Sequence, residues 1–154
     1  MEGMILRPMQ IKDLKTVLRI ENESFHSSWS ENQFLEEINA EENRAWTAEI
    51  LGETVGYMTL FPILNEMHLT NIAVDKNYHR NGIGRELVRK VEEIALEKYC
   101  TEITLEVRDG NEPAISLYEK HKFECVGRRK NYYASEDADA LIMTKKTGGK
   151  YELV

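Results

Sequence analysis

Residues Leu69–Val88 read "LTNIAVDKNYHRNGIGRELV", and this stretch carries the clearest structural signal in the chain. An apolar segment leads into a polar loop with two glycines, and a helix-like pattern follows. Glycine lets a ligand approach the backbone closely. The free N–H groups and the dipole of a helix N-terminus favour an anion. The stretch therefore predicts a strand, an anion-binding loop and a helix, in that order.

Basic side chains surround this loop, namely those of Lys76, Arg80 and Arg85. The whole chain has a net charge of −7, which argues against a general nucleic-acid binder, because such a protein needs a basic face. The basic cluster is therefore a local feature of an acidic chain, and its positive charge suits the binding of a phosphate group. A Gly-x-Gly sequence alone is neither a dinucleotide fingerprint nor a P-loop. An ordinary tight turn with solvated charges is the alternative.

Length and composition indicate a folded domain. The 154 residues suit one core, and 42% of them are hydrophobic. We find no apolar run near the roughly 20 residues of a membrane helix, and from the N-terminal residues we expect no signal peptide. Cys100 and Cys125 belong to no CxxC pair, so a disulfide scaffold or a zinc site is not expected. These features favour a reducing cytoplasm.

Hydrophobic periodicity predicts a mixed α/β domain over residues 1–146, with a tail at 147–154. Ser30 to Gln33 resembles a capping box, so a helix is expected to begin at Glu31. Asn111 is expected to cap another helix. The predicted strands are 5–9, 45–51, 54–63, 66–74, 101–108, 123–133 and 138–145, and the predicted helices are 11–25, 31 onward, 84–99 and 111–121.

The string "NIAVDKNYHRNGIGRELV" resembles the acetyl-CoA signature of the GCN5-related N-acetyltransferases, the GNAT superfamily. That signature is Q/R-x-x-G-x-G/A directly after a strand, and His79 stands where the family has Gln or Arg. The resemblance implies the GNAT fold, a mixed and mostly antiparallel central sheet flanked by helices. It also implies that acetyl-CoA contacts Ile72, Ala73, Val74, His79, Arg80, Asn81, Gly82, Ile83, Gly84 and Arg85.

A second stretch, "LEVRDGNEPAISLYEKHKFECVGRRKNYY", is similar to the ribosomal-protein-alanine N-acetyltransferase (RimI-like) branch and to related archaeal N-terminal acetyltransferases. "SFHSSWS" and "DADALIM" match that branch too, so the resemblance runs from about Ile5 to Lys145. It implies that Glu106 is the general base and Tyr118 the general acid, and that Asn111 touches the pantetheine arm of acetyl-CoA.

The same resemblance makes four aromatic residues the walls of the substrate groove: Phe25, Trp29, Tyr132 and Tyr133. The residues alone also allow purely structural roles. Glu106 could be a solvated carboxylate on a strand, and the aromatic side chains, Tyr118 included, could simply pack in the core. The histidines show no metal-ligand spacing, so no metal is expected.

Elementary acid–base chemistry favours an α-amine substrate. A protein α-amine has a pKa of about 7.7–8.0 and lysine about 10.4, a difference of roughly 3 kcal/mol. A carboxylate, acting directly or through a water, can therefore deprotonate an α-amine more readily than the amine of a lysine. Tyrosine, with a pKa of about 10, can protonate a thiolate of about 8.5 at a cost of about 2 kcal/mol. By resemblance, a backbone N–H of the strand at Ile72–Val74 stabilises the oxyanion.

We therefore expect a cytoplasmic enzyme, a monomer or weak homo-oligomer, that moves acetyl from acetyl-CoA to protein or peptide N-termini by direct attack. Nucleic acid and membrane are not expected as partners. The alternatives are acetylation of a lysine or a small-molecule amine, a non-catalytic acyl-CoA sensor, and a nucleotide-binding regulatory module. Glu106 and Tyr118 argue against the sensor, because binding alone does not need both. Trp29 and the Tyr132–Tyr133 pair favour a peptide over a small polar amine.

Overall fold

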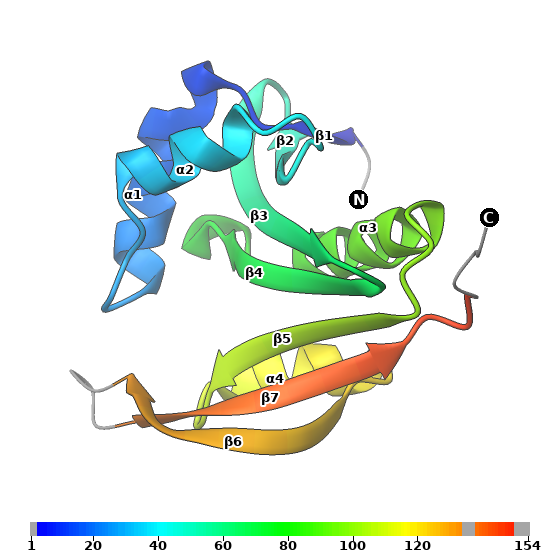
Figure 1. The fold of residues 1–154 in the computed structure, drawn as a ribbon. Helices are drawn as coiled ribbons and strands as arrows, with labels where there is room; N and C mark the ends of the chain where they lie inside the picture. Colours follow the sequence, from blue (N-terminus) through cyan, green and yellow to red (C-terminus); the bar gives the residue numbers. More distant parts are fainter. Residues whose placement is uncertain (1–2, 134–137, 150–154) are drawn as a thin grey trace. The chain divides into compact units, whose positions relative to one another are not determined.

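The computed structural model describes residues 3–133 and 138–149. Within them, helices and strands follow one another much as the sequence predicts (Figure 1). The strands are β1 (Met4–Pro8), β2 (Ala45–Ile50), β3 (Glu53–Ile63), β4 (Glu66–Val74), β5 (Glu102–Arg108), β6 (Glu124–Tyr133) and β7 (Ala138–Lys146). The helices are α1 (Leu14–Ser24), α2 (Glu31–Ile38), α3 (Ile83–Glu97) and α4 (Glu112–Lys120), with short 3-10 helices η1 (Ile11–Asp13) and η2 (Lys76–Tyr78).

The strands of the described residues form a seven-stranded sheet in the order β1-β2-β3-β4-β5-β7-β6. β4 and β5 pair in parallel, whereas β1–β2, β2–β3, β5–β7 and β6–β7 are antiparallel. The expected mixed, mostly antiparallel sheet with helices is therefore confirmed. No helix in the described part of the chain is long and apolar enough to span a membrane.

The chain divides into two compact units. The first unit is Met1–Leu60 with Asn71–Leu87, and the second is Phe61–Thr70 with Val88–Val154. β3, β4 and α3 contribute residues to both units. The single domain predicted for residues 1–146 stays a prediction. So does the tail at 147–154, of which residues 150–154 lie outside the described part.

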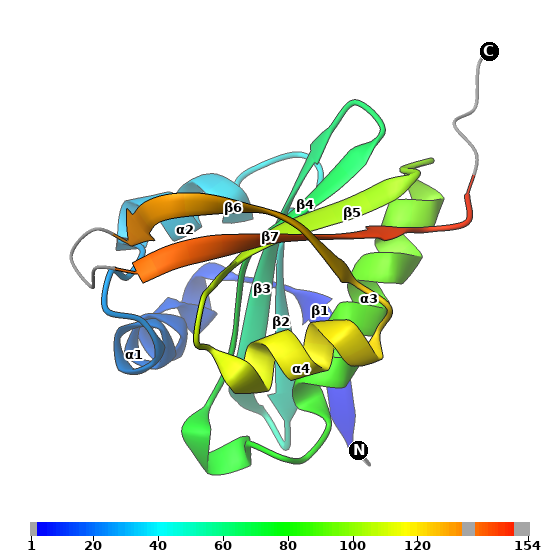
Figure 2. The ribbon, with the colours of Figure 1, turned by 90° about the horizontal axis from the view of Figure 1, so that it is seen from below.

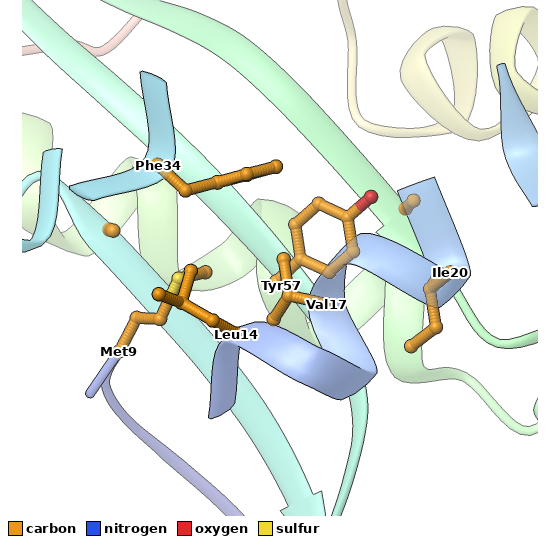
Figure 3. Packing of buried hydrophobic residues seen from close by; sticks show 8 residues of the cluster. Met9, Leu14, Val17, Ile20, Phe34 and Tyr57 are labelled. Carbon is orange, nitrogen blue, oxygen red and sulfur yellow. The ribbon is translucent and has the colours of Figure 1, made fainter. Parts of the chain in front are cut away.

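The core of the first unit forms where α1 and α2 pack against β2 and β3. Apolar side chains recur along α1 at helical spacing, so one face of this helix is buried. Ser30 caps α2 by accepting a hydrogen bond from the Gln33 backbone N–H, which confirms the capping box and the helix start at Glu31. Figure 3 shows the cluster, which consists of Met9, Leu14, Val17, Ile20, Phe34, Ala45, Tyr57 and Ala73.

In the second unit, β5, β7 and β6 pair with one another, and α4 lies alongside them (Figure 2). In β5, Ile103, Leu105 and Val107 are buried, whereas the residues between them are partly exposed, which confirms the predicted alternation. Asn111 caps α4, because its side chain accepts a hydrogen bond from the Ala114 backbone N–H at 3.4 Å. This cap was also predicted from the sequence.

Candidate active site

The predicted site residues fall into two sets, one in each unit. The first unit holds the predicted acetyl-CoA strand and loop, together with Phe25 and Trp29. The second unit holds Glu106, Asn111, Tyr118, Tyr132 and Tyr133. Each set has its own geometry and its own chemistry.

The glycine-rich loop ends at the N-terminus of α3. Two of its residues have left-handed backbone conformations, Arg80 with φ of 67° and Gly82 with φ of 79°. The Glu86 N–H donates to the carbonyl of Gly82 at 3.1 Å, so the helical hydrogen bonds begin there. The N–H groups of Ile83, Gly84 and Arg85 precede this bond and have no carbonyl partner within the helix. They form a row of donors that suits a phosphate group.

Side chains of the loop hold its backbone in place. The His79 Nε2 lies 2.9 Å from the carbonyl oxygen of Val74, so this nitrogen donates to the end of β4. The Asn81 Nδ2 donates to the Tyr78 carbonyl at 3.1 Å. The His79 ring therefore orders the loop in this structure. A contact between that ring and acetyl-CoA stays a prediction.

Gly56, in the middle of β3, allows α3 to start close to the sheet. A Cβ at this position would lie 3.2 Å from the carbonyl oxygen of Ala73 and 3.3 Å from Cγ2 of Ile83. Gly56 was not predicted as a site residue from the sequence. An isolated glycine inside a strand pattern indicates a close approach of another backbone, and that signal could have found it.

Asp75 ties the start of the loop to α1. Its carboxylate is buried, and Oδ2 lies 2.8 Å from a guanidinium nitrogen of Arg19. Burial by itself raises the pKa of Asp75, but the hydrogen bonds from Arg19 and from the Asn77 N–H outweigh it, so the pKa is lowered. This pair was also missed, because Arg19 and Asp75 lie 56 positions apart in the sequence.

Phe25 and Trp29 lie in or beside the connection between α1 and α2, and both pack against the core of the first unit. The Trp29 ring centroid is 5.2 Å from that of Phe34. The Trp29 backbone N–H donates to the buried carboxylate of Glu21 at 2.9 Å. Both aromatic residues are therefore partly core residues, and their contact with a substrate stays a prediction.

In the second unit, Glu106 extends from the partly exposed face of β5. Its Oε1 lies 3.1 Å from Nε of Arg129, and 28% of its side chain is exposed. Its Oε2 is buried and makes no hydrogen bond within the described part of the chain. The pKa of Tyr132 is raised, mainly by burial and secondly by the negative charge of Glu106. A carboxylate with one oxygen held and the other unpartnered can still accept a proton donor.

Tyr132 lies beside this carboxylate, and it belongs to a pair of contacting aromatic rings in the second unit. The rings of Tyr132 and Tyr133 meet edge to face at 5.1 Å between centroids, and the Arg129 guanidinium lies 5.7 Å from the Tyr132 centroid. Tyr118 is buried, and its ring is 5.8 Å from that of Phe123. Burial, and next the neighbouring Tyr133, raises the pKa of Tyr118. A raised pKa makes Tyr118 a weaker acid than an ordinary tyrosine, which works against proton transfer to a thiolate.

Asn111 stands at the N-terminus of α4, the helix that carries Tyr118. Its side-chain oxygen is engaged in capping, so its expected contact with a pantetheine arm stays a prediction. Taken together, the second set offers a proton acceptor in Glu106 and a proton donor in Tyr118. The first set offers a row of backbone N–H donors at the start of α3, predicted to be an anion cradle, and two aromatic side chains that pack partly in the core.

Known proteins are similar to this chain in sequence and in fold. Residues 14–123 match the acetyltransferase (GNAT) family. The ribosomal protein bS18-alanine N-acetyltransferase of Escherichia coli (strain K12) is 32% identical over 137 residues, which are 88% of this chain and 92% of that protein. The N-alpha-acetyltransferase of Sulfurisphaera tokodaii is 30% identical over 151 residues, which are 90% of each.

Among solved structures, the ribosomal-protein-S18-alanine N-acetyltransferase from Escherichia coli superposes with a TM-score of 0.85 at 30% identity, and the match covers 98% of each chain. Ard1 from Thermoplasma volcanium gives a TM-score of 0.88 at 25% identity, covering 94% of this chain and 97% of that one. Sequence and fold agree, and this chain belongs to the acetyltransferase (GNAT) family.

Proposed function

We propose that this protein transfers acetyl from acetyl-CoA to the N-terminal α-amine of proteins, with Glu106 as the base and Tyr118 as the acid. The observation that carries the proposal is the state of Glu106. One of its oxygens is held by Arg129, and the other is buried without a hydrogen-bond partner in the described residues. A buried acceptor without a donor is costly, so this oxygen suits the N–H of an amine or the O–H of a bridging water.

The donors at the start of α3 support acetyl-CoA as the acetyl source. The backbone N–H groups of Ile83, Gly84 and Arg85 match the pyrophosphate of coenzyme A, and Arg80 adds a positive charge next to them. The backbone of Ile72–Val74 follows the segment of β4 that pairs with β5, which ends at Leu69. In our proposal this backbone contacts the thioester and stabilises its oxyanion.

The relatives support an α-amine as the acceptor. The Escherichia coli relative is named for alanine of ribosomal protein bS18, and the Sulfurisphaera tokodaii relative is named an N-alpha-acetyltransferase. An α-amine has a pKa of about 7.7–8.0, so a large fraction is neutral near physiological pH. Ribosomal-protein-like N-termini are therefore the substrate class that we propose.

The reaction is a direct acyl transfer. Glu106 takes a proton from the amine as the amine nitrogen attacks the thioester carbon, so that a C–N bond forms. The C–S bond then breaks, and Tyr118 gives its proton to the departing sulfur. Tyr118 keeps its proton over the whole neutral range, as an ordinary tyrosine does, and its raised pKa makes the transfer of that proton to sulfur less favourable. The products are the N-acetylated chain and free coenzyme A.

The surroundings in our proposal are those of a cytoplasmic enzyme that acts as a monomer or weak homo-oligomer, without nucleic-acid or membrane partners. Two reduced cysteines, Cys100 and Cys125, support a reducing compartment. The net charge of −7 supports the absence of a nucleic-acid partner.

The test is thiol release from acetyl-CoA with a panel of short peptides that differ in their first residue. Each peptide is paired with an N-terminally blocked copy that carries an internal lysine. We expect release only with free N-termini, and the ranking of rates gives the preferred first residue. Release with the blocked copies would instead show lysine acetylation. No release from any peptide, with acetyl-CoA still bound in calorimetry, would leave a small-molecule acetyltransferase or an acyl-CoA sensor.

A further inference from the structure

The first unit contains a buried carboxylate that the proposed reaction does not use. Glu21 lies near the C-terminal end of α1, and only 1% of it is exposed. It takes part in no ion pair within the described part of the chain. Removing a carboxylate from water without a cation is costly, so its hydrogen bonds must compensate.

Three donors from three separate segments meet at this carboxylate. The Tyr57 hydroxyl of β3 donates to Oε1 at 2.5 Å, and the Asn71 amide of β4 donates to the same oxygen at 2.8 Å. The Trp29 backbone N–H donates to Oε2 at 2.9 Å. Burial, and next the charge of Glu21, raises the pKa of Tyr57, so this hydroxyl keeps its proton and remains a donor. Hydrogen bonds to a charged acceptor are roughly twice as strong as neutral ones.

The loop that Glu21 holds carries two of the four aromatic residues predicted to line the substrate groove, Phe25 and Trp29. We call it the wall loop, Phe25–Ser30. Its backbone is fixed at Trp29 by Glu21, and the Trp29 ring rests on Phe34. The Phe34 ring in turn meets the Tyr57 ring at 5.6 Å between centroids. Figure 3 shows Phe34 and Tyr57 in the core cluster. Tyr57 therefore supports the wall loop twice, through its hydroxyl and through its ring.

The other end of the network lies directly beside the predicted acetyl strand. Asn71 immediately precedes Ile72–Val74 in β4, the backbone expected to contact the thioester. One carboxylate thus connects the wall loop with the strand on which the acetyl group would lie. Such a connection fixes the position of the wall loop relative to β4 within the first unit.

We infer that Glu21 is a positioning residue, which sets the wall loop against β4 so that the first residues of a substrate peptide are held in register with the acetyl group. The inference rests on the proposed function for its substrate. It predicts that loss of the Glu21 contacts weakens peptide binding and reduces the differences in rate among peptides with different first residues. Acetyl-CoA binding should stay intact, because the anion cradle lies on another loop.

The experiment uses Glu21→Gln, with Glu23→Gln as the matched control, since Glu23 is on the same helix with a third of its side chain exposed. A glutamine offers one accepting oxygen where three donors converge, so at least one hydrogen bond is lost. We expect the peptide KM to rise about tenfold, which is about 1.4 kcal/mol. Both variants should bind acetyl-CoA with the wild-type dissociation constant. The Glu23→Gln control should also keep the wild-type melting temperature.

A second readout reports on the wall loop itself. Trp29 and Trp46 are the two tryptophans of the chain, so Trp46→Phe leaves Trp29 as the single tryptophan fluorophore. In that background we expect Glu21→Gln to increase acrylamide quenching of Trp29, and Glu23→Gln to leave it unchanged. This measurement needs no substrate. If no peptide is acetylated by the wild type, the proposed function fails, while quenching still tests the positioning role.

A folded Glu21→Gln variant with wild-type peptide KM, first-residue ranking and Trp29 quenching would overturn the inference. If that variant does not fold, Tyr57→Phe removes one donor and keeps the carboxylate. We then expect a smaller rise in peptide KM and in quenching, with acetyl-CoA affinity kept. Wild-type values for Tyr57→Phe would equally overturn the positioning role.

Discussion

Gly56→Ala tests how closely α3 must approach the sheet for the anion cradle to form. The added Cβ would lie 3.2 Å from the Ala73 carbonyl oxygen, 3.3 Å from Ile83 Cγ2 and 3.5 Å from Leu87 Cδ1. The first two distances are shorter than ordinary van der Waals contact. The first neighbour is the backbone of β4 and the second is a side-chain carbon of the first residue of α3, so we expect relief to include a small shift of the helix start away from β3.

Two opposing effects decide the magnitude. Replacing glycine by alanine reduces the entropy of the unfolded chain and stabilises by about 0.4–1 kcal/mol where the backbone fits. Overpacking a well-packed core costs about 1–3 kcal/mol. We expect overpacking to win by about 1 kcal/mol, which lowers the melting temperature by about 2–4 °C for a chain of this length. Acetyl-CoA affinity should fall about fivefold, or about 1 kcal/mol, because the N–H donors after Gly82 move with the helix.

The assay combines thermal unfolding with calorimetric titration of acetyl-CoA, and Gly127→Ala is the control. A Cβ at Gly127 meets only Ile142 Cδ1 at 3.5 Å, an ordinary contact, so that variant should be neutral or slightly stabilised. Wild-type stability and affinity in Gly56→Ala would refute the reasoning. An equal loss in Gly127→Ala would show that any alanine in a strand has this effect.

Two further predictions concern carboxylates. Glu106→Gln should lower kcat by about 10²–10⁴ with acetyl-CoA affinity kept, and Glu102→Gln on the same strand should not; unchanged steady-state rates would remove Glu106 from the mechanism. Asp13→Asn should make the free energy of unfolding depend less on pH in the acid range. Burial raises the pKa of Asp13, but the Arg7 guanidinium and the Gln10 N–H lower it more, so its folded pKa lies below the unfolded one. This stabilisation is present above about pH 4 and is lost as pH falls through the folded pKa, so denaturant unfolding should separate mutant from wild type at neutral pH and much less in acid. A difference that does not change with pH would contradict this.

Local rules of the sequence account for most of the elements. The capping box at Ser30 predicted the start of α2, and β4 has the predicted bounds Glu66–Val74. The alternation along β5 placed Glu106 opposite three buried residues, as observed. Helix α3 begins at Ile83 rather than at the predicted Gly84, so Gly84 is a helical residue. The roles of the site residues came from family resemblance and remain predictions.

The sequence by itself determined the order of the elements, the glycine-rich loop at a helix start and the family. These features depend on neighbouring residues, through periodicity, capping and turn chemistry. Only the tertiary structure decided that Glu21 is buried beneath donors 36 and 50 positions away, that Arg129 holds Glu106, and that α3 starts against Gly56. Such contacts arise when distant segments pack together, and no local pattern records which side chains then meet.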